Sequence, residues 1–200
     1  MTAKQPKFDL ECGLVRALCD ALTLPVDSYE DPHAGNVPER GVDVIAHSRG
    51  MKFGVQVTTP DFGVVRGADR SSEAKAYQRA KNENDGVYFH WGTGNPNQVL
   101  NSFRRSIEEK SAIAKRHDFS TFSEAWLLIS CGVPIPGAVV STFLPPWVDT
   151  GEIDRWTQKA LRNSSYNRVF IHSISDPVQR LWVWTALDRR WVQLLGPPAR

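Results

Sequence analysis

The sequence predicts a mixed α/β fold, a β-sheet that carries helices on its faces. Segments with helical periodicity alternate with short apolar runs along the chain, and two neighbouring runs near the start have the pattern of a hairpin. The composition, 41% apolar and 23% charged, is that of an ordinary globular chain, and 200 residues suit one domain over 1–200.

The first helix is expected over 8–22, because Leu14, Val15, Leu18 and Leu22 fall on one stripe at helical spacing. A polar, turn-rich stretch follows over 25–40. Two apolar strands, 42–47 and 52–58, come next, joined by the short link 48–50, which predicts a tight hairpin turn.

Local signals define the later elements. Asp69 or Ser71 is expected to cap a helix, Pro96 suits a first helical position, and Asp149 with Glu152 forms a capping signal. The stretch 132–150 is rich in proline and is expected to be irregular. The later helices and strands are expected at 71–82 (helix), 86–91 (strand), 96–116 (helix), 125–131 (strand), 149–163 (helix), and 168–174, 181–187 and 191–195 (strands).

Composition limits the functional classes. No run approaches the roughly 20 apolar residues that span a bilayer, and the first residues lack the apolar region of a signal peptide. Three cysteines without CxxC spacing are typical of reduced thiols, so we expect a cytoplasmic protein that uses no membrane. The net charge of +2 is too small to indicate nucleic acid by itself.

Glu11 is the most unusual residue of the first helix. It lies three, four and seven residues before Leu14, Val15 and Leu18, so it projects from the apolar stripe. A carboxylate directed at a core is costly unless it is paired, which predicts a partner. The alternative is that Glu11 only favours the positive end of the helix dipole.

Asp43 and Gln56 are candidate partners for Glu11. Gln56 lies on the polar face of its expected strand, and Asp43 lies in the preceding one, so hairpin pairing can bring the two side chains together. Carboxylate and amide oxygens are the ligands that Mg²⁺ prefers, and a bound metal can activate water for phosphoryl displacement. The alternatives are a turn aspartate and a solvated glutamine.

On these residues the chain resembles the PD-(D/E)xK phosphodiesterase superfamily, the restriction-endonuclease-like fold. The match consists of Glu11, of Asp43 in GVDVI, and of Gln56 to Thr58 in FGVQVTT. The resemblance implies a restriction-endonuclease-like mixed sheet flanked by helices over 8–131. Residues 132–200 then form a C-terminal elaboration of extra strands and a helix. It also implies Mg²⁺ (or Mn²⁺) held by Asp43, Gln56 and Glu11.

The family's lysine, which orients the attacking water, is replaced by Thr58 in this chain. Lys52 shares the strand face of Gln56 but lies about 13 Å away by strand rise. Family members can carry this lysine on a neighbouring element, and Lys75 or Lys81 of the next expected helix is our preferred substitute.

Lys110 is a second anomaly, because it falls within the apolar stripe of the helix expected over 96–116. Its stem can extend along apolar surface while the ammonium reaches water. Alternatively, the ammonium reaches the acidic cluster or a bound phosphate. The loop 92–97 and several arginines are weaker candidates for phosphate contacts: Arg66, Arg70, Arg79, Arg104 and Arg105.

The sequence thus predicts a metal-dependent nuclease-like protein that acts on nucleic acid phosphodiester bonds, with Glu11, Asp43, Gln56, Lys75 and Lys81 as catalytic residues. The alternative is a degenerate relative without activity that binds nucleic acid or a protein partner. A third hypothesis is an unrelated interaction protein that uses the tryptophan-rich C-terminal third, although packing is the simpler role for those rings.

Overall fold

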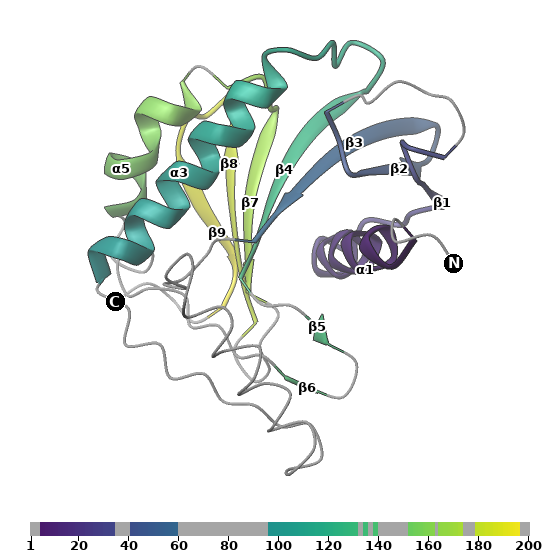
Figure 1. The fold of residues 1–200 in the computed structure, drawn as a ribbon, viewed down its shortest axis with the longest axis horizontal. Helices are drawn as coiled ribbons and strands as arrows, with labels where there is room; N and C mark the ends of the chain where they lie inside the picture. Colours follow the sequence, from purple (N-terminus) through teal and green to yellow (C-terminus); the bar gives the residue numbers. More distant parts are fainter. Residues whose placement is uncertain are drawn as a thin grey trace, which may run out of the picture.

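The computed structural model describes residues 5–34, 41–59, 96–131, 134–135, 138–139, 152–162, 164–173 and 179–196 (Figure 1). These residues form a mixed α/β fold around a seven-stranded sheet of order β1-β2-β3-β4-β7-β8-β9. The strands of this sheet are β1 (Ser28–Glu30), β2 (Val44–Ser48), β3 (Met51–Thr58), β4 (Glu124–Cys131), β7 (Arg168–Ser173), β8 (Arg180–Thr185) and β9 (Trp191–Leu195). A second, two-stranded sheet joins β5 (Pro134–Ile135) to β6 (Ala138–Val139).

The centre of the main sheet is parallel and its two sides are antiparallel. β4 pairs in parallel with both β3 and β7, whereas β1, β2, β8 and β9 join by antiparallel pairing. The carboxyl ends of β3, β4 and β7 therefore lie along one edge of the sheet. Because β2 runs the other way, its first residues lie at that same edge.

Two helical layers cover the sheet (Figure 1). α1 (Gln5–Ala21) packs on one face, mainly against β2 and β3, while α3 (Pro96–Ala114) and α5 (Glu152–Leu161) lie together on the other. Successive residues of a strand face opposite helical layers. In β4, Leu127 faces α3 and α5, whereas Trp126 faces α1.

The hairpin between β2 and β3 has the turn that its sequence predicts. Val44 pairs with Val55 and Ser48 with Met51, which leaves a two-residue loop. Both loop residues have positive φ, 49° at Arg49 and 77° at Gly50, as a type I′ turn requires. This turn fixes the register, and Asp43, one residue before β2, bonds to the backbone of Val55 and Val57 in β3.

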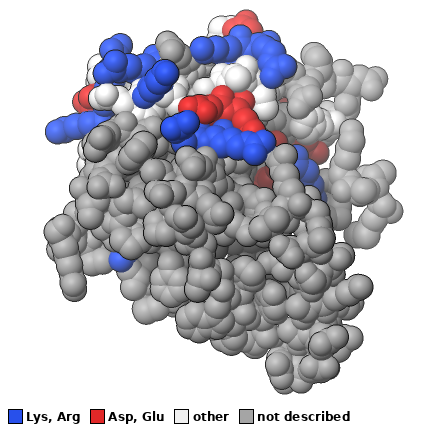
Figure 2. All heavy atoms as spheres, turned by 60° about the vertical axis from the view of Figure 1, so that its left-hand side comes forward, with Lys and Arg blue, Asp and Glu red and all other residues white. Residues whose placement is uncertain are grey.

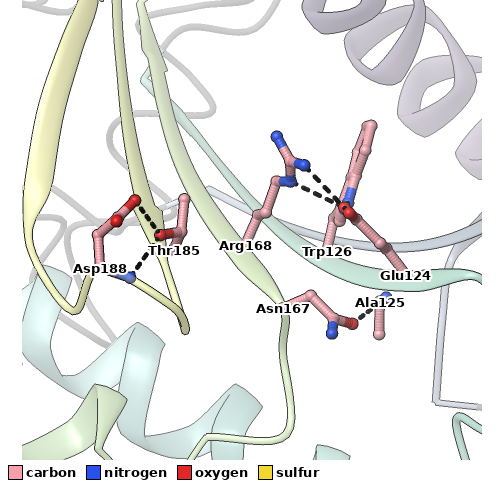
Figure 3. A network of polar contacts seen from close by, with 7 residues as sticks. All are labelled: Glu124, Ala125, Trp126, Asn167, Arg168, Thr185 and Asp188. Atoms are coloured by element: carbon pink, nitrogen blue, oxygen red, sulfur yellow. Dashed lines mark hydrogen bonds and ion pairs between the residues drawn. The ribbon is translucent and has the colours of Figure 1, made fainter.

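A polar network fastens the amino ends of β4 and β7 (Figure 3). The Arg168 guanidinium donates to both oxygens of Glu124, at 2.8 and 3.0 Å, and Trp126 Nε1 donates to Glu124 Oε2 at 2.6 Å. Asn167 Oδ1 accepts from the Ala125 amide at 2.7 Å. These contacts set the register of two neighbouring parallel strands at the edge opposite the candidate site.

The structure confirms most of the predicted elements, with boundaries within a few residues. Elements expected at 71–82 and 86–91 lie outside the described residues. The short edge strand β1 was not predicted, because its sequence, SYE, lies in a stretch that reads as turns. The stretch 132–150 includes the small β5–β6 pair. Within the described chain, no helix combines the length and apolar character needed to cross a membrane.

We expect Gly54→Ala to destabilise the fold by about 1–3 kcal/mol through overpacking. A Cβ at Gly54 would lie 2.9 Å from the Phe122 ring, and that ring is buried against Val42 and Ile45. Denaturant unfolding would measure the change. The control is Gly13→Ala in α1, where a Cβ would meet nothing within 4 Å and alanine should stabilise the helix. Equal stability of the two variants would contradict the packing argument.

Candidate functional site

The carboxylates of Glu11 and Asp43 both contact one ammonium group, that of Lys7. Lys7 Nζ lies 3.3 Å from Glu11 Oε1 and 3.6 Å from Asp43 Oδ1. The acidic side chains are only 15% and 12% exposed, whereas that of Lys7 is 66% exposed. The structure thus brings together two of the predicted site residues, from α1 and from the start of β2, and pairs them with a cation from the first turns of α1.

The backbone of the hairpin holds Asp43 in place. Its amide donates to the Val55 carbonyl at 2.9 Å, and its Oδ2 accepts from the Val57 amide at 2.9 Å. The carboxylate therefore closes the hydrogen-bond ladder at the carboxyl end of β3. Oδ1, the other oxygen, faces Lys7 and Glu11.

The environment of Glu11 disfavours its charged form. Burial raises the pKa of Glu11, and the nearby negative charge of Asp43 raises it further, while Lys7 and, more weakly, Lys110 lower it. Partial burial lowers the pKa of Lys7, but the two carboxylates outweigh that effect and the net shift is upward. Two close carboxylates with one exposed cation are an arrangement that a second, divalent cation would stabilise.

Gln56 is 5% exposed, so it is not a solvated strand residue. Its Oε1 accepts a hydrogen bond from the hydroxyl of Tyr166, which also lies 3.2 Å from the Lys110 carbonyl oxygen. Burial raises the pKa of Tyr166, and the negative charge of Asp43 adds to the shift, so the phenol stays protonated. Gln56 is thus tied to Tyr166 through its side-chain oxygen.

Lys110 approaches the acidic pair from α3, on the opposite face of the sheet from α1. It is half-buried, and its positive charge acts on the Glu11 carboxyl. That the Lys110 ammonium contacts the acids stays a prediction. Lys110 joins Lys75 and Lys81 as a candidate for the role of the motif lysine that Thr58 replaces.

Other lysine candidates lie elsewhere. Lys75 and Lys81, the preferred substitutes in the sequence, lie outside the described residues. Lys52 pairs in register with His47 near the hairpin turn, and its ammonium lies 5.7 Å from the centre of the Phe122 ring. Lys52 thus occupies the far end of β3 from Gln56.

The described arginines do not form a uniform basic face. Arg104 pairs with Glu108 at 3.4 Å and Arg105 with Glu109 at 2.6 Å, each one turn along α3. The coloured part of Figure 2 accordingly shows acidic and basic side chains next to one another. The other predicted phosphate contacts, Arg66, Arg70, Arg79 and most of the loop 92–97, lie outside the described residues.

Three tryptophans of the last third serve packing. Trp182, Trp184 and Trp191 are 6%, 4% and 7% exposed and belong to the core beneath α3 and α5. The hypothesis that these three rings form a contact surface is therefore wrong.

Sequence reasoning missed two residues of the site. Lys7 carried a usable signal, because it lies four residues before Glu11 on the same helix face. Tyr166 carried none, since it is 110 residues from Gln56 in sequence and only the pairing of β4 with β7 brings it close.

The oxygen donors suit a hard divalent cation. In the described ranges no three His, Cys, Asp or Glu side chains cluster closely enough to hold a metal ion, so a site here would rest on two carboxylates. Mg²⁺ is commonly bound by one or two carboxylates and retains several waters. Glu11 and Asp43 fit that requirement, whereas the Gln56 oxygen accepts the hydrogen bond from Tyr166 on the face of β3 opposite α1.

Comparisons with known proteins add little. No family model matches the chain, and no curated protein matches its sequence. Among solved structures, that of Pyrococcus furiosus SfsA in complex with Ca²⁺ aligns with a TM-score of 0.24 and 10% identity, covering 94% of this chain and 60% of that one. A TM-score this low does not establish a shared fold.

Proposed function

We propose that this protein is a divalent-metal-dependent phosphodiesterase of the restriction-endonuclease-like class that acts on nucleic acid. The proposal rests on one observation: the carboxylates of Glu11 and Asp43 lie together at the carboxyl end of β3, where both contact Lys7. The positive charge of Lys110 also lowers the pKa of Glu11. Glu11 and Asp43 are two of the three ligands that the sequence resemblance implies, and Lys110 is a further candidate for the lysine that the motif lacks at Thr58.

Each residue has a role set by its chemistry. Glu11 and Asp43 would hold Mg²⁺ or Mn²⁺, and Gln56 would add a neutral oxygen ligand. When bound, the metal supplies activation of water and stabilisation of the phosphate charge. Lys110 would orient the attacking water or neutralise the phosphate, because it is the described cation of α3 that acts on the acidic pair. Lys75 and Lys81 remain proposals for the same role.

One observation favours the alternative of a binding module without activity. Lys7 contacts both carboxylates, so the acidic pair already has a counter-cation of its own. If that pairing persists, the same fold would hold nucleic acid or a protein partner without cleaving it.

The direct test is cleavage of single- and double-stranded DNA and of RNA with Mg²⁺ or Mn²⁺, by the parent and by Lys110→Met. Methionine keeps most of the length of the stem and removes the charge. We expect the variant to lose about 100-fold in kcat, the magnitude typical for loss of one group that stabilises transition-state charge. Lys115→Met, an exposed lysine just past the end of α3, is the matched control and should cleave like the parent.

Different outcomes separate the candidate functions. Full activity of Lys110→Met would remove Lys110 from the mechanism and leave Lys75 or Lys81 as the lysine. A parent protein that cleaves none of these substrates but binds nucleic acid, with an affinity that falls steeply as salt rises, would support the binding module instead.

A further inference from the structure

Tyr166 is almost fully buried, at 1% exposed, and its hydroxyl bonds to Gln56. It lies two residues before β7, and its ring centre is 5.9 Å from that of Phe119. The neighbouring backbone is fixed on both sides. The Tyr166 amide bonds to Ser164 Oγ, and Asn167 exchanges two hydrogen bonds with Ala125 at 2.7 and 2.8 Å.

The hydroxyl of Tyr166 links β3, at Gln56, to α3, at Lys110. It donates to Gln56 Oε1 of β3, and it lies 3.2 Å from the backbone oxygen of Lys110 in α3. One phenol thus contacts the amide at the position of the second motif acid and the residue whose ammonium acts on Glu11.

The amide of Gln56 needs such a contact. A carboxylate would be drawn to a divalent cation by its charge, in any of several orientations, whereas an amide presents one oxygen and one nitrogen on opposite sides. The hydrogen bond from Tyr166 fixes which side the Gln56 oxygen occupies. The same hydroxyl meets the carbonyl of Lys110, so it also sets how far α3 lies from β3 at the point where Lys110 projects.

We propose that Tyr166 is a positioning residue of this site, which acts through Gln56 and Lys110 rather than on the substrate. The inference rests on the proposed phosphodiesterase function. Losing the hydroxyl frees the Gln56 amide to rotate and loosens the spacing between α3 and β3, while the apolar packing of the ring stays.

The test is Tyr166→Phe in the full-length protein, with Thr157→Val as the control. The control also removes one buried hydroxyl contact, the bond from Trp191 Nε1 to Thr157 Oγ1 at 2.9 Å, beneath α5. Assays are run at a temperature where circular dichroism shows both variants fully folded. The readouts are Mn²⁺ affinity by titration calorimetry, and kcat and KM for nucleic acid cleavage.

For Tyr166→Phe we expect a loss of about 10–100-fold in Mn²⁺ affinity or in kcat, the range typical of groups that orient a ligand, with KM for nucleic acid unchanged. In the Lys110→Met background the loss should shrink, because the two residues act together. Thr157→Val should match the parent in every readout.

Two results would overturn the inference, and they are distinguishable. If Tyr166→Phe and Thr157→Val both match an active, Mn²⁺-binding parent, Tyr166 has only a packing role and the proposed function stands. If the parent neither binds Mn²⁺ nor cleaves nucleic acid, the proposed function fails and the positioning role fails with it.

Discussion

Asp43→Asn is expected to reduce metal-dependent cleavage by at least about 100-fold while leaving the fold intact. A metal acting as a Lewis acid contributes several kcal/mol to the transition state, and about 3 kcal/mol corresponds to that factor. Asparagine keeps an oxygen that can accept from the Val57 amide, so the end of the hairpin should remain closed. What disappears is the negative charge that faces Lys7 and Glu11.

The matched control for this variant is Asp27→Asn. Asp27 Oδ2 also accepts a hydrogen bond from a backbone amide, that of Arg49 at 2.8 Å, but at the turn end of the hairpin. Steady-state cleavage with Mn²⁺ and thermal unfolding of both variants would give the comparison. If Asp43→Asn cleaves as fast as Asp27→Asn, the activity arises at another site or from a contaminant.

His172 should make the protein lose stability as the medium becomes acidic. The side chain is 1% exposed, and burial lowers its pKa from 6.5 to about 4. Between these two values the unfolded chain binds the proton and the folded chain does not, so the free energy of unfolding falls as pH falls from about 6.5 to 4. The difference corresponds to roughly 3–4 kcal/mol at most, since one pKa unit is worth about 1.4 kcal/mol.

We expect His172→Gln to remove most of that slope. Glutamine does not titrate, and its side-chain oxygen can accept from Gln179 Nε2, which lies 2.9 Å from His172 Nε2. Denaturant unfolding at several values between pH 4 and 7 would measure the slope. His33→Gln, at an exposed histidine, is the control and should keep the slope of the parent. A parent whose stability does not change over this range would show that His172 is protonated without cost in the fold.

Much of the local structure could be predicted because it depends on neighbours in the sequence. The helix around Glu11 follows from a stripe at helical spacing, and α1 has it over Gln5–Ala21. The hairpin follows from two apolar runs and a short polar link, and the two-residue loop at Arg49 and Gly50 has the expected conformation. The charge on an apolar stripe correctly indicated that Glu11 is paired, although its partner is the exposed Lys7 of the same helix.

The candidate site was only partly predictable. Glu11 and Asp43 both contact Lys7, but the expectation that the first helix covers the face of Gln56 is wrong: α1 covers the face of Val55 and Val57, and Gln56 lies on the other face. The position of Lys110 relative to these two acids could not be predicted from short segments of the sequence, since it depends on how α3 packs across the sheet. The same holds for Tyr166, which meets Gln56 only because β7 pairs with β4 and β4 with β3.

The sequence by itself determined the helices, the hairpin and the position of Asp43 at the end of that hairpin, because periodicity, turn chemistry and capping act over a few residues. Only the tertiary structure decided which cations face those acids and that a phenol holds the glutamine. Those contacts join segments separated by up to 110 residues, and long-range strand pairing and helix packing have no signature in any local stretch of the chain.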